Sequence, residues 1–233
     1  MNEKLLVCSG LTKLFGTKQA LTGVDLTVGS GKIVGLLGPN GSGKTTFLKL
    51  INGLIQPTGG SVLIDGQAPG VYTHSITSYL PDRMFLNDWM KVIDLIRFFD
   101  DFYSDFDFPK AMDMLQSLGL SSSERLKTLS KGTKEKVQLI VTMARKAKLY
   151  LLDEPIGGVD PAARDYILNT ILTNYSEDST VIISTHLIAD IERVLDEIVF
   201  LKNGEMTLYD TVDNIREREG KSVDQLFREV FAC

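Results

Sequence analysis

Cysteine and histidine are scarce in this sequence, with two of each among 233 residues. The two thiols, Cys8 and Cys233, stand at opposite ends of the chain, and their spacing is not that of a disulfide framework. This usage is typical of a protein from a reducing compartment such as the cytoplasm. We expect Cys8 to be a small core residue and Cys233 an incidental thiol of the tail, since unpaired cysteine usually behaves in this way.

Long apolar runs are also missing, as is an excess of positive charge. No run approaches the roughly 20 apolar residues that are needed to span a bilayer, and residues 1–4 do not begin a secretory signal peptide. Asp and Glu outnumber Lys and Arg by 30 to 25, whereas general nucleic-acid binders usually carry a basic patch. We therefore expect no nucleic-acid partner, and we expect any work at a membrane to require a partner subunit.

Strand-like and helix-like patterns alternate along most of the chain. Continuous apolar runs at 33–37, 149–152 and 180–184 are typical of strands buried on both faces, and helical patterns lie between them. Short apolar stretches broken by glycines at 5–28 predict an N-terminal antiparallel β-portion. The alternation predicts an α/β fold with a mostly parallel central sheet that is covered on both faces.

The pattern changes at 83–144, where much of the aromatic content gathers in helix-like segments. We expect Asp88 to cap the first helix, Pro109 to lie in the first turn of a second, and a third helix to begin near Gly132. We interpret this stretch as an α-helical subdomain that is inserted into the α/β core.

The tail predicts a further helix. Ser222 and Gln225 form a capping box, and the apolar side chains that follow share one helical face. We expect that face to dock on its own domain, with contact to a partner subunit as the alternative. The predicted organisation is one domain over 1–233, which comprises an α/β core at 1–82 and 145–210, the helical subdomain at 83–144 and a helical tail at 211–233.

A glycine-rich segment after the first buried run fits the phosphate-binding loop pattern in full, and it lies between a predicted strand and a predicted helix. Glycines let the backbone N–H groups point at phosphate oxygens, and the helix N-terminus adds partial positive charge. Lys44 would meet the β- and γ-phosphates of a nucleotide, and the Thr45 hydroxyl would help to hold Mg²⁺. The candidate phosphate-binding residues are Gly38, Pro39, Asn40, Gly41, Ser42, Gly43, Lys44, Thr45 and Thr46.

Two carboxylates, Asp153 and Glu154, follow the second buried run. A carboxylate at the C-terminal edge of a parallel strand suits a Mg²⁺ ion bound to phosphates, and we assign this role to Asp153. The adjacent Glu154 can face an attacking water. Taken alone, the pair could also be two surface acids at the end of a strand.

Three shorter segments narrow the possibilities. They are, in chain order, Leu129-Ser130-Lys131-Gly132-Thr133, Gly158-Val159-Asp160-Pro161 and Ser184-Thr185-His186. They resemble, respectively, the signature loop, the D-loop and the switch histidine of ABC transporter ATP-binding subunits. With the phosphate loop and the two carboxylates, they stand in that family's order. The resemblance extends over nearly the whole chain. The stretches at 80–83 and 88–90 resemble bacterial ABC-2-type exporters in particular.

The resemblance implies a P-loop NTPase core of the RecA-like type, which binds and hydrolyses ATP with Mg²⁺. Glu154 would be the general base or would orient the attacking water, and His186 would contact the γ-phosphate. Phe15 stands where an aromatic ring usually stacks on adenine, and an ordinary core position is its alternative. His186, taken alone, could equally be a structural histidine.

The resemblance also implies a dimer. Ser130 and Gly132, with Lys131 between them, would contact the γ-phosphate of the ATP bound by the other protomer, and Asp160 would lie at the dimer seam. The other protomer would be an identical or a related chain. A separate transmembrane permease subunit would hold the protein at the cytoplasmic face of the cell membrane, with export as the expected direction of transport.

Three positions depart from the family's pattern. Lys131 and Thr133 replace a glycine and a glutamine of the signature loop, and Asp82 replaces a glutamine after the Leu-Pro pair. We expect Lys131 to add a cation near the γ-phosphate, or else to be a solvated lysine at the rim of the loop. We expect Asp82 to support the metal, since hard oxygen ligands suit Mg²⁺, or else only to join the core to the helical subdomain.

Two other function classes share some of these features. A soluble ABC ATPase acting on ribosomes or DNA usually has two such domains in one chain or long coiled-coil insertions, and this sequence has neither. A small-molecule kinase or a GTPase with a phosphate loop would not need the signature loop or His186. His74, which belongs to no motif, is expected at the surface.

Overall fold

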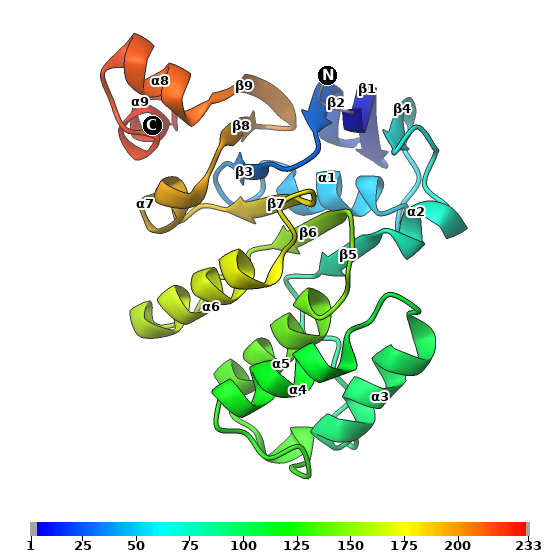
Figure 1. Cartoon of the computed structure of the whole chain (residues 1–233). Helices are drawn as coiled ribbons and strands as arrows, with labels where there is room; N and C mark the ends of the chain where they lie inside the picture. Colours follow the sequence, from blue (N-terminus) through cyan, green and yellow to red (C-terminus); the bar gives the residue numbers. More distant parts are fainter. Residues whose placement is uncertain (1–3, 232–233) are drawn as a thin grey trace.

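The computed structural model describes residues 4–231, apart from the side chains at 162 and 163, and contains two β-sheets (Figure 1). The expectation for Cys233 falls outside these residues. The strands are β1 (Lys4–Phe15), β2 (Lys18–Gly29), β3 (Ile33–Leu37), β4 (Gly59–Ile64), β5 (Thr77–Leu80), β6 (Leu149–Asp153), β7 (Thr180–Thr185), β8 (Glu197–Lys202) and β9 (Glu205–Thr211). The α-helices are α1 (Lys44–Ile51), α2 (Val71–Ser75), α3 (Val92–Phe102), α4 (Phe108–Ser117), α5 (Lys131–Met143), α6 (Pro161–Asn174), α7 (Ile188–Ile191), α8 (Val212–Glu219) and α9 (Val223–Phe231).

The two sheets differ in direction. The three-stranded sheet is antiparallel, in the order β2-β1-β4. The six-stranded sheet has the order β5-β6-β7-β3-β8-β9, in which β9 runs antiparallel to β8 and the other pairs run parallel. This arrangement confirms the predicted α/β fold with a mostly parallel sheet and an N-terminal antiparallel portion. Helix α1 lies between the two sheets, as Figure 1 shows.

The short apolar strands are buried on both faces, as their continuous apolar runs predict. Along β3, Ile33 and Leu37 join the apolar cluster that includes the helical region and α6, whereas Val34 and Leu36 join the cluster around α1. The expectation for Cys8 is confirmed, because this residue is buried in the α1 cluster. Burial and the charge of Asp25 raise the pKa of its thiol to about 12, which leaves it neutral.

The helices α3, α4 and α5 gather at one end of the molecule, beyond β5 and β6 (Figure 1). The predicted start of the second helix is confirmed, with Pro109 in the first turn of α4 and the Asp107 carboxylate accepting a hydrogen bond from the Lys110 N–H. Helix α5 begins at Lys131, close to the predicted Gly132.

The predicted cap at Asp88 is wrong, because α3 begins later, at Val92, after Lys91. The backbone at Asp88 is hydrogen-bonded to another segment, because the Asp88 carbonyl accepts from the Lys127 N–H at 3.0 Å. The Asp88 carboxylate instead pairs with Lys134 of α5 at 2.6 Å. This acid therefore joins the segment before α3 to the first turns of α5.

The tail helix docks on its own domain, as expected. Ser222 and Gln225 form the predicted capping box. The Ser222 N–H donates to Gln225 Oε1 at 3.0 Å, and the Gln225 N–H donates to Ser222 Oγ at 3.1 Å. The rings of Phe227 and Phe231 contact Phe200 of β8 edge-on, with ring centres 5.5 and 5.6 Å apart. No helix within residues 4–231 combines the length and the apolar character of a membrane-crossing segment.

Candidate nucleotide site

The phosphate loop occupies the turn between β3 and α1. Its glycines adopt backbone conformations that other residues rarely reach, with φ of 82° at Gly41 and 110° at Gly43. A Cβ at Gly43 would lie 2.6 Å from the carbonyl oxygen of Ala20, and one at Gly38 would lie 2.3 Å from that of Leu201. Side chains at these positions would prevent the close curl that points N–H groups at phosphates.

The hairpin between β8 and β9 supports the loop from outside. The Gly204 N–H donates to the Ser42 carbonyl at 2.9 Å, and the Gly204 carbonyl accepts from the Thr22 N–H of β2 at 2.9 Å. Both turn residues have positive φ, 51° at Asn203 and 83° at Gly204, as the Asn-Gly pair predicts. The loop is therefore held by β2 and by the hairpin as well as by its own glycines.

Lys44, the first residue of α1, is buried with 4% of its surface exposed. Its ammonium donates to the carbonyls of Gly38 at 2.7 Å and Pro39 at 3.3 Å. It also forms an ion pair with Glu154, with 3.2 Å between Nζ and Oε1. These contacts hold the ammonium inside the curve of the loop.

Glu154 follows β6 and turns away from the strand through a left-handed backbone, with φ of 50°. Its N–H donates to the carbonyl of Ser184 at 3.1 Å and to the Ser184 hydroxyl at 3.0 Å. Because β6 and β7 are parallel neighbours, their carboxyl ends meet and bring His186 to the same edge. His186 Nδ1 lies 3.0 Å from Glu154 Oε2, so the carboxylate is held between the Lys44 ammonium and an imidazole.

Asp153 lies behind Glu154 and is buried. Its Oδ1 accepts hydrogen bonds from the hydroxyls of Ser184 at 2.6 Å and Thr45 at 3.2 Å. Its Oδ2 is buried with no hydrogen-bond partner among the described residues. Burial raises the pKa of Asp153 above its ordinary value, and the charges of Asp82 and Glu154 raise it further. A divalent cation at Oδ2 would satisfy this oxygen and compensate the negative charge.

Thr45 and Asp153 therefore fit a Mg²⁺ ion. Within residues 4–231, His, Cys, Asp and Glu side chains form no group of three or more that could hold a metal by themselves. Mg²⁺ is usually bound through one or two carboxylates, substrate phosphates and several waters, so a sparse set of protein ligands is sufficient. Asp82 lines the same cleft and is the further oxygen ligand that could support the ion.

One cleft of about 840 Å³ collects most of the predicted site residues, and this volume is typical of small-molecule sites. Phe15 lines it with 49% of its surface exposed, so it is not an ordinary core residue. The Lys13 ammonium lies 5.0 Å from the centre of this ring. The predicted residues in the lining are Phe15, Asn40, Gly41, Gly43, Lys44, Thr45, Thr46, Asp82, Lys131, Glu154 and His186.

The other predicted residues do not line this cleft. Ser42 and Asp153 are buried, and Gly38 and Pro39 form the base of the loop through their carbonyls. Asp160 precedes α6, where its carbonyl accepts from the Arg164 N–H at 3.1 Å.

Ser130 and Gly132, at the start of α5, do not themselves line the cleft, although Lys131 between them does. Ser130 caps the helix, with its Oγ accepting from the Thr133 N–H at 3.2 Å. Lys131 has 82% of its side chain exposed and pairs with Glu135 at 3.7 Å. A Cβ on Gly132 would meet no atom within 4 Å, so the space beside this residue is open.

Ser184 has a larger part in the site than the sequence indicates. In the sequence it is only the first member of the Ser-Thr-His segment. In the structure its hydroxyl donates to the Asp153 carboxylate and accepts from the Glu154 N–H. Lys18 and Gln19 also line the cleft, beside Phe15. The position of β2 against the phosphate loop brings them there, and no motif marks them.

Comparisons with known proteins agree on one family. Residues 21–157 match the family model described as "ABC transporter". An uncharacterised ABC transporter ATP-binding protein of Methanocaldococcus jannaschii is 34% identical over 92% of this chain and 80% of that protein. The aliphatic sulfonates import ATP-binding protein SsuB of Pseudomonas putida is 34% identical over 91% of this chain and 78% of that protein. A solved structure of an ATP-binding subunit of an ABC transporter has a TM-score of 0.86 at 29% identity, covering 97% of this chain and 99% of that one.

Proposed function

Because this chain belongs to the ABC transporter family as an ATP-binding, ATP-hydrolysing subunit, we propose that it closes as a dimer around two ATP molecules and thereby drives a separate membrane subunit. The hydrolytic part of this proposal is supported by the arrangement of Glu154 between Lys44 and His186, at 3.2 and 3.0 Å, on the edge of the cleft. A carboxylate in this position suits a proton acceptor beside the cation that we assign to the phosphates.

The residues divide the chemistry among them. The phosphate loop and Lys44 bind the phosphates, and Phe15 stacks on the adenine. The Glu154 carboxylate accepts a proton from water as the water oxygen bonds to the γ-phosphorus and the bond to ADP breaks. His186 orients that carboxylate through its 3.0 Å contact and reaches toward the γ-phosphate. Mg²⁺, held by Thr45 and Asp153, would supply positive charge to the phosphate oxygens.

Asp82 gives a test of the metal side of this site. We expect Asp82→Ala to raise the Mg²⁺ concentration for half-maximal hydrolysis by about tenfold, because an oxygen that supports the ion is lost. ATP binding without metal should weaken less, or improve, since a negative charge has left the cleft. Titrating Mg²⁺ against the ATPase rate measures this, with Asp82→Asn as a variant of matched shape. Superimposable curves for the wild type and Asp82→Ala would mean that Asp82 only joins the core to the helical region.

The position of the signature loop supports the proposed dimer. Ser130 and Gly132 do not line the cleft of their own chain, although Lys131 between them does, and the space beside Gly132 is open. Such a terminus carries free N–H groups and partial positive charge, which suit the phosphates of a nucleotide bound by another protomer. We assign Asp160 to the seam between the two protomers, which are identical or related chains.

Lys131 tests the dimer directly. We expect Lys131→Gly to weaken ATP-driven dimerisation, because an exposed cation near the γ-phosphate of the other protomer is removed. The loss should shrink at high salt, where exposed charges are screened. Sedimentation of the wild type, Lys131→Gly and Lys131→Gln with ATP at two salt concentrations measures this, and the two variants should agree if charge is the cause. Equal dimer affinity in all three proteins at low salt would show Lys131 to be a solvated lysine.

An exposed aromatic face on the helical region supports the membrane partner. It comprises Phe85, Phe98 and Phe102, all of them exposed, and the ring of Phe99 contacts both Phe85 and Phe98. Phe102 has 68% of its surface exposed and stacks on Phe98 with ring centres 6.0 Å apart. Apolar surface gathered in this way marks a binding site for another protein.

We assign this aromatic face to a transmembrane permease subunit at the cytoplasmic face of the membrane, with export as the direction of transport. The experiment is purification of the chain from detergent-solubilised membranes, in which a multi-span membrane protein should accompany it. Full activity on a nucleic-acid partner in a membrane-free preparation would contradict the assignment.

A further inference from the structure

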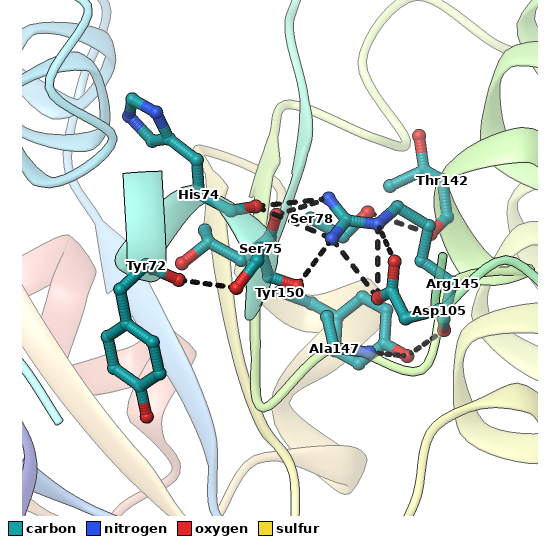
Figure 2. Close-up of polar contacts among 10 residues, drawn as sticks. Tyr72, His74, Ser75, Ser78, Asp105, Thr142, Arg145, Ala147 and Tyr150 are labelled. Atoms are coloured by element: carbon teal, nitrogen blue, oxygen red, sulfur yellow. Dashed lines mark hydrogen bonds and ion pairs between the residues drawn. The ribbon is translucent and has the colours of Figure 1, made fainter. Parts of the chain in front are cut away.

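Arg145 joins three segments of the chain through one buried side chain, which has 3% of its surface exposed. It lies just after α5, and Figure 2 shows its guanidinium between Asp105 and the backbone that leads into β5. Nε donates to the Asp105 carboxylate at 3.0 Å, Nη1 to the Thr77 carbonyl at 2.6 Å and Nη2 to the Ser75 carbonyl at 2.8 Å. The guanidinium carbon lies 3.9 Å from the centre of the Tyr103 ring.

These contacts need an arginine. A buried cation has to be paired and hydrogen-bonded, and the Asp105 carboxylate accepts from both Nε and Nη2 of the same guanidinium. The planar fork can satisfy a carboxylate and two carbonyls while one face stacks on Tyr103. Lysine offers a single point of donation on a flexible stem and cannot repeat this geometry.

The three joined segments lead to different parts of the nucleotide machinery. Helix α5 ends at Met143, just before Arg145, and carries Ser130 at its other end. Strand β5 begins at Thr77 and leads to Asp82 in the cleft. A second tie between the same two elements is the hydrogen bond from the Ser78 hydroxyl of β5 to the Thr142 carbonyl of α5, at 2.8 Å.

The third segment, which contains Tyr103 and Asp105, connects α3 with α4. Helix α3 carries Phe98 and Phe102 of the aromatic face, and Tyr103 follows it directly. Arg145 is therefore the residue at which the aromatic face, the signature-loop helix and the strand leading to Asp82 come together.

We propose that Arg145 is a positioning residue for ATP turnover: it fixes the direction of α5 relative to β5, and so the place at which the Ser130–Gly132 loop is presented to the other protomer's ATP. A helix of 13 residues is about 20 Å long. A rotation of about 10° at its anchored end would move the loop by about 3 Å over that length. Misplacement by about 1 Å can slow a reaction by about 100-fold. The proposal rests on the dimer proposed above.

Arg145→Lys tests it through a split between binding and turnover. ATP affinity should stay within about twofold of the wild type, because Arg145 does not contact the phosphate loop. We expect kcat to fall by about tenfold or more, since the fork and the stacked face are lost, and ATP-driven dimerisation to weaken in parallel. Asp105→Asn and Tyr103→Leu touch the same guanidinium and should show the same split; they carry the test if Arg145→Lys does not fold.

Tyr150→Phe is the matched control. The Tyr150 hydroxyl donates to the backbone carbonyl of Arg145 and accepts from the Ala147 N–H at 3.3 Å, in the same buried network (Figure 2). The variant should lower Tm and leave kcat unchanged, because the guanidinium contacts remain.

The outcomes separate the two proposals. A wild-type chain that hydrolyses ATP without dimerising would overturn the proposed dimer, and this inference with it. The role of Arg145 alone would be overturned if the wild type dimerises and the Arg145→Lys variant keeps its kcat. It would also be overturned if Arg145→Lys and Tyr150→Phe, compared at equal Tm, lose the same share of kcat. Parallel losses of ATP affinity and kcat in Arg145→Lys would also overturn it, since they indicate general destabilisation.

Discussion

Replacing Glu154 with glutamine should leave ATP binding intact and slow turnover by about 10²- to 10⁴-fold, the usual effect of removing a general base. The amide has the shape of the carboxylate but cannot accept a proton from water. The geometry adds a second expectation. Because Glu154 pairs with Lys44 at 3.2 Å, the variant frees this ammonium for the phosphates, and ATP affinity should be equal to or tighter than that of the wild type.

The measurements are single-turnover hydrolysis and sedimentation with ATP and Mg²⁺. The Glu154→Gln variant should accumulate as an ATP-bound dimer, because closure remains possible and hydrolysis no longer opens it. Glu205→Gln is the control, since this glutamate is exposed at the start of β9 and lies outside the cleft. Near-normal hydrolysis by Glu154→Gln would remove Glu154 from the catalytic role.

Lys44→Ala should weaken ATP binding by about 10- to 100-fold. A hydrogen bond to a charged group contributes about 1.5–3 kcal/mol, and about 1.4 kcal/mol corresponds to a tenfold change in affinity. Lys44 is buried and already directed into the loop by the carbonyls of Gly38 and Pro39, so little reordering is needed before it meets a phosphate. Equilibrium titration with ATP measures the effect directly.

The same substitution leaves the Glu154 carboxylate without its cation, so Tm should be recorded beside the affinity. Lys49→Ala is the matched control, because this lysine stands in the last turn of the same helix and does not line the cleft. If Lys44→Ala and Lys49→Ala bind ATP equally well, the phosphate-binding role of Lys44 is excluded.

Local patterns predict the fold and the edges of the cleft well. Glu154 follows β6 directly, and His186 follows β7 directly. Because the two strands are parallel neighbours, their carboxyl ends lie side by side, and the contact between Glu154 and His186 follows from this topology. The phosphate loop is equally local, since its glycines encode the positive φ values that the turn requires. These features depend on short segments and on one rule about strands.

Longer-range contacts could not be predicted in this way. Arg145 looks like any charged residue near a helix end, and its partner Asp105 is 40 residues away along the chain. Asp88 is of a residue type that often caps helices, yet its carbonyl accepts a hydrogen bond from Lys127 and its carboxylate pairs with Lys134. In each case a tertiary partner decides the role of the residue, and no local pattern identifies that partner.

The contact between the β8–β9 hairpin and the phosphate loop bears on how tightly nucleotide can bind. A flexible loop loses conformational entropy when a ligand orders it, and that loss subtracts from affinity. Here the Gly204 N–H already fixes the Ser42 carbonyl at 2.9 Å, and Gly204 is fixed in turn by Thr22. These hydrogen bonds fix the Ser42 backbone in the absence of nucleotide. The backbone contacts of the hairpin and of β2 therefore preorganise the loop for nucleotide.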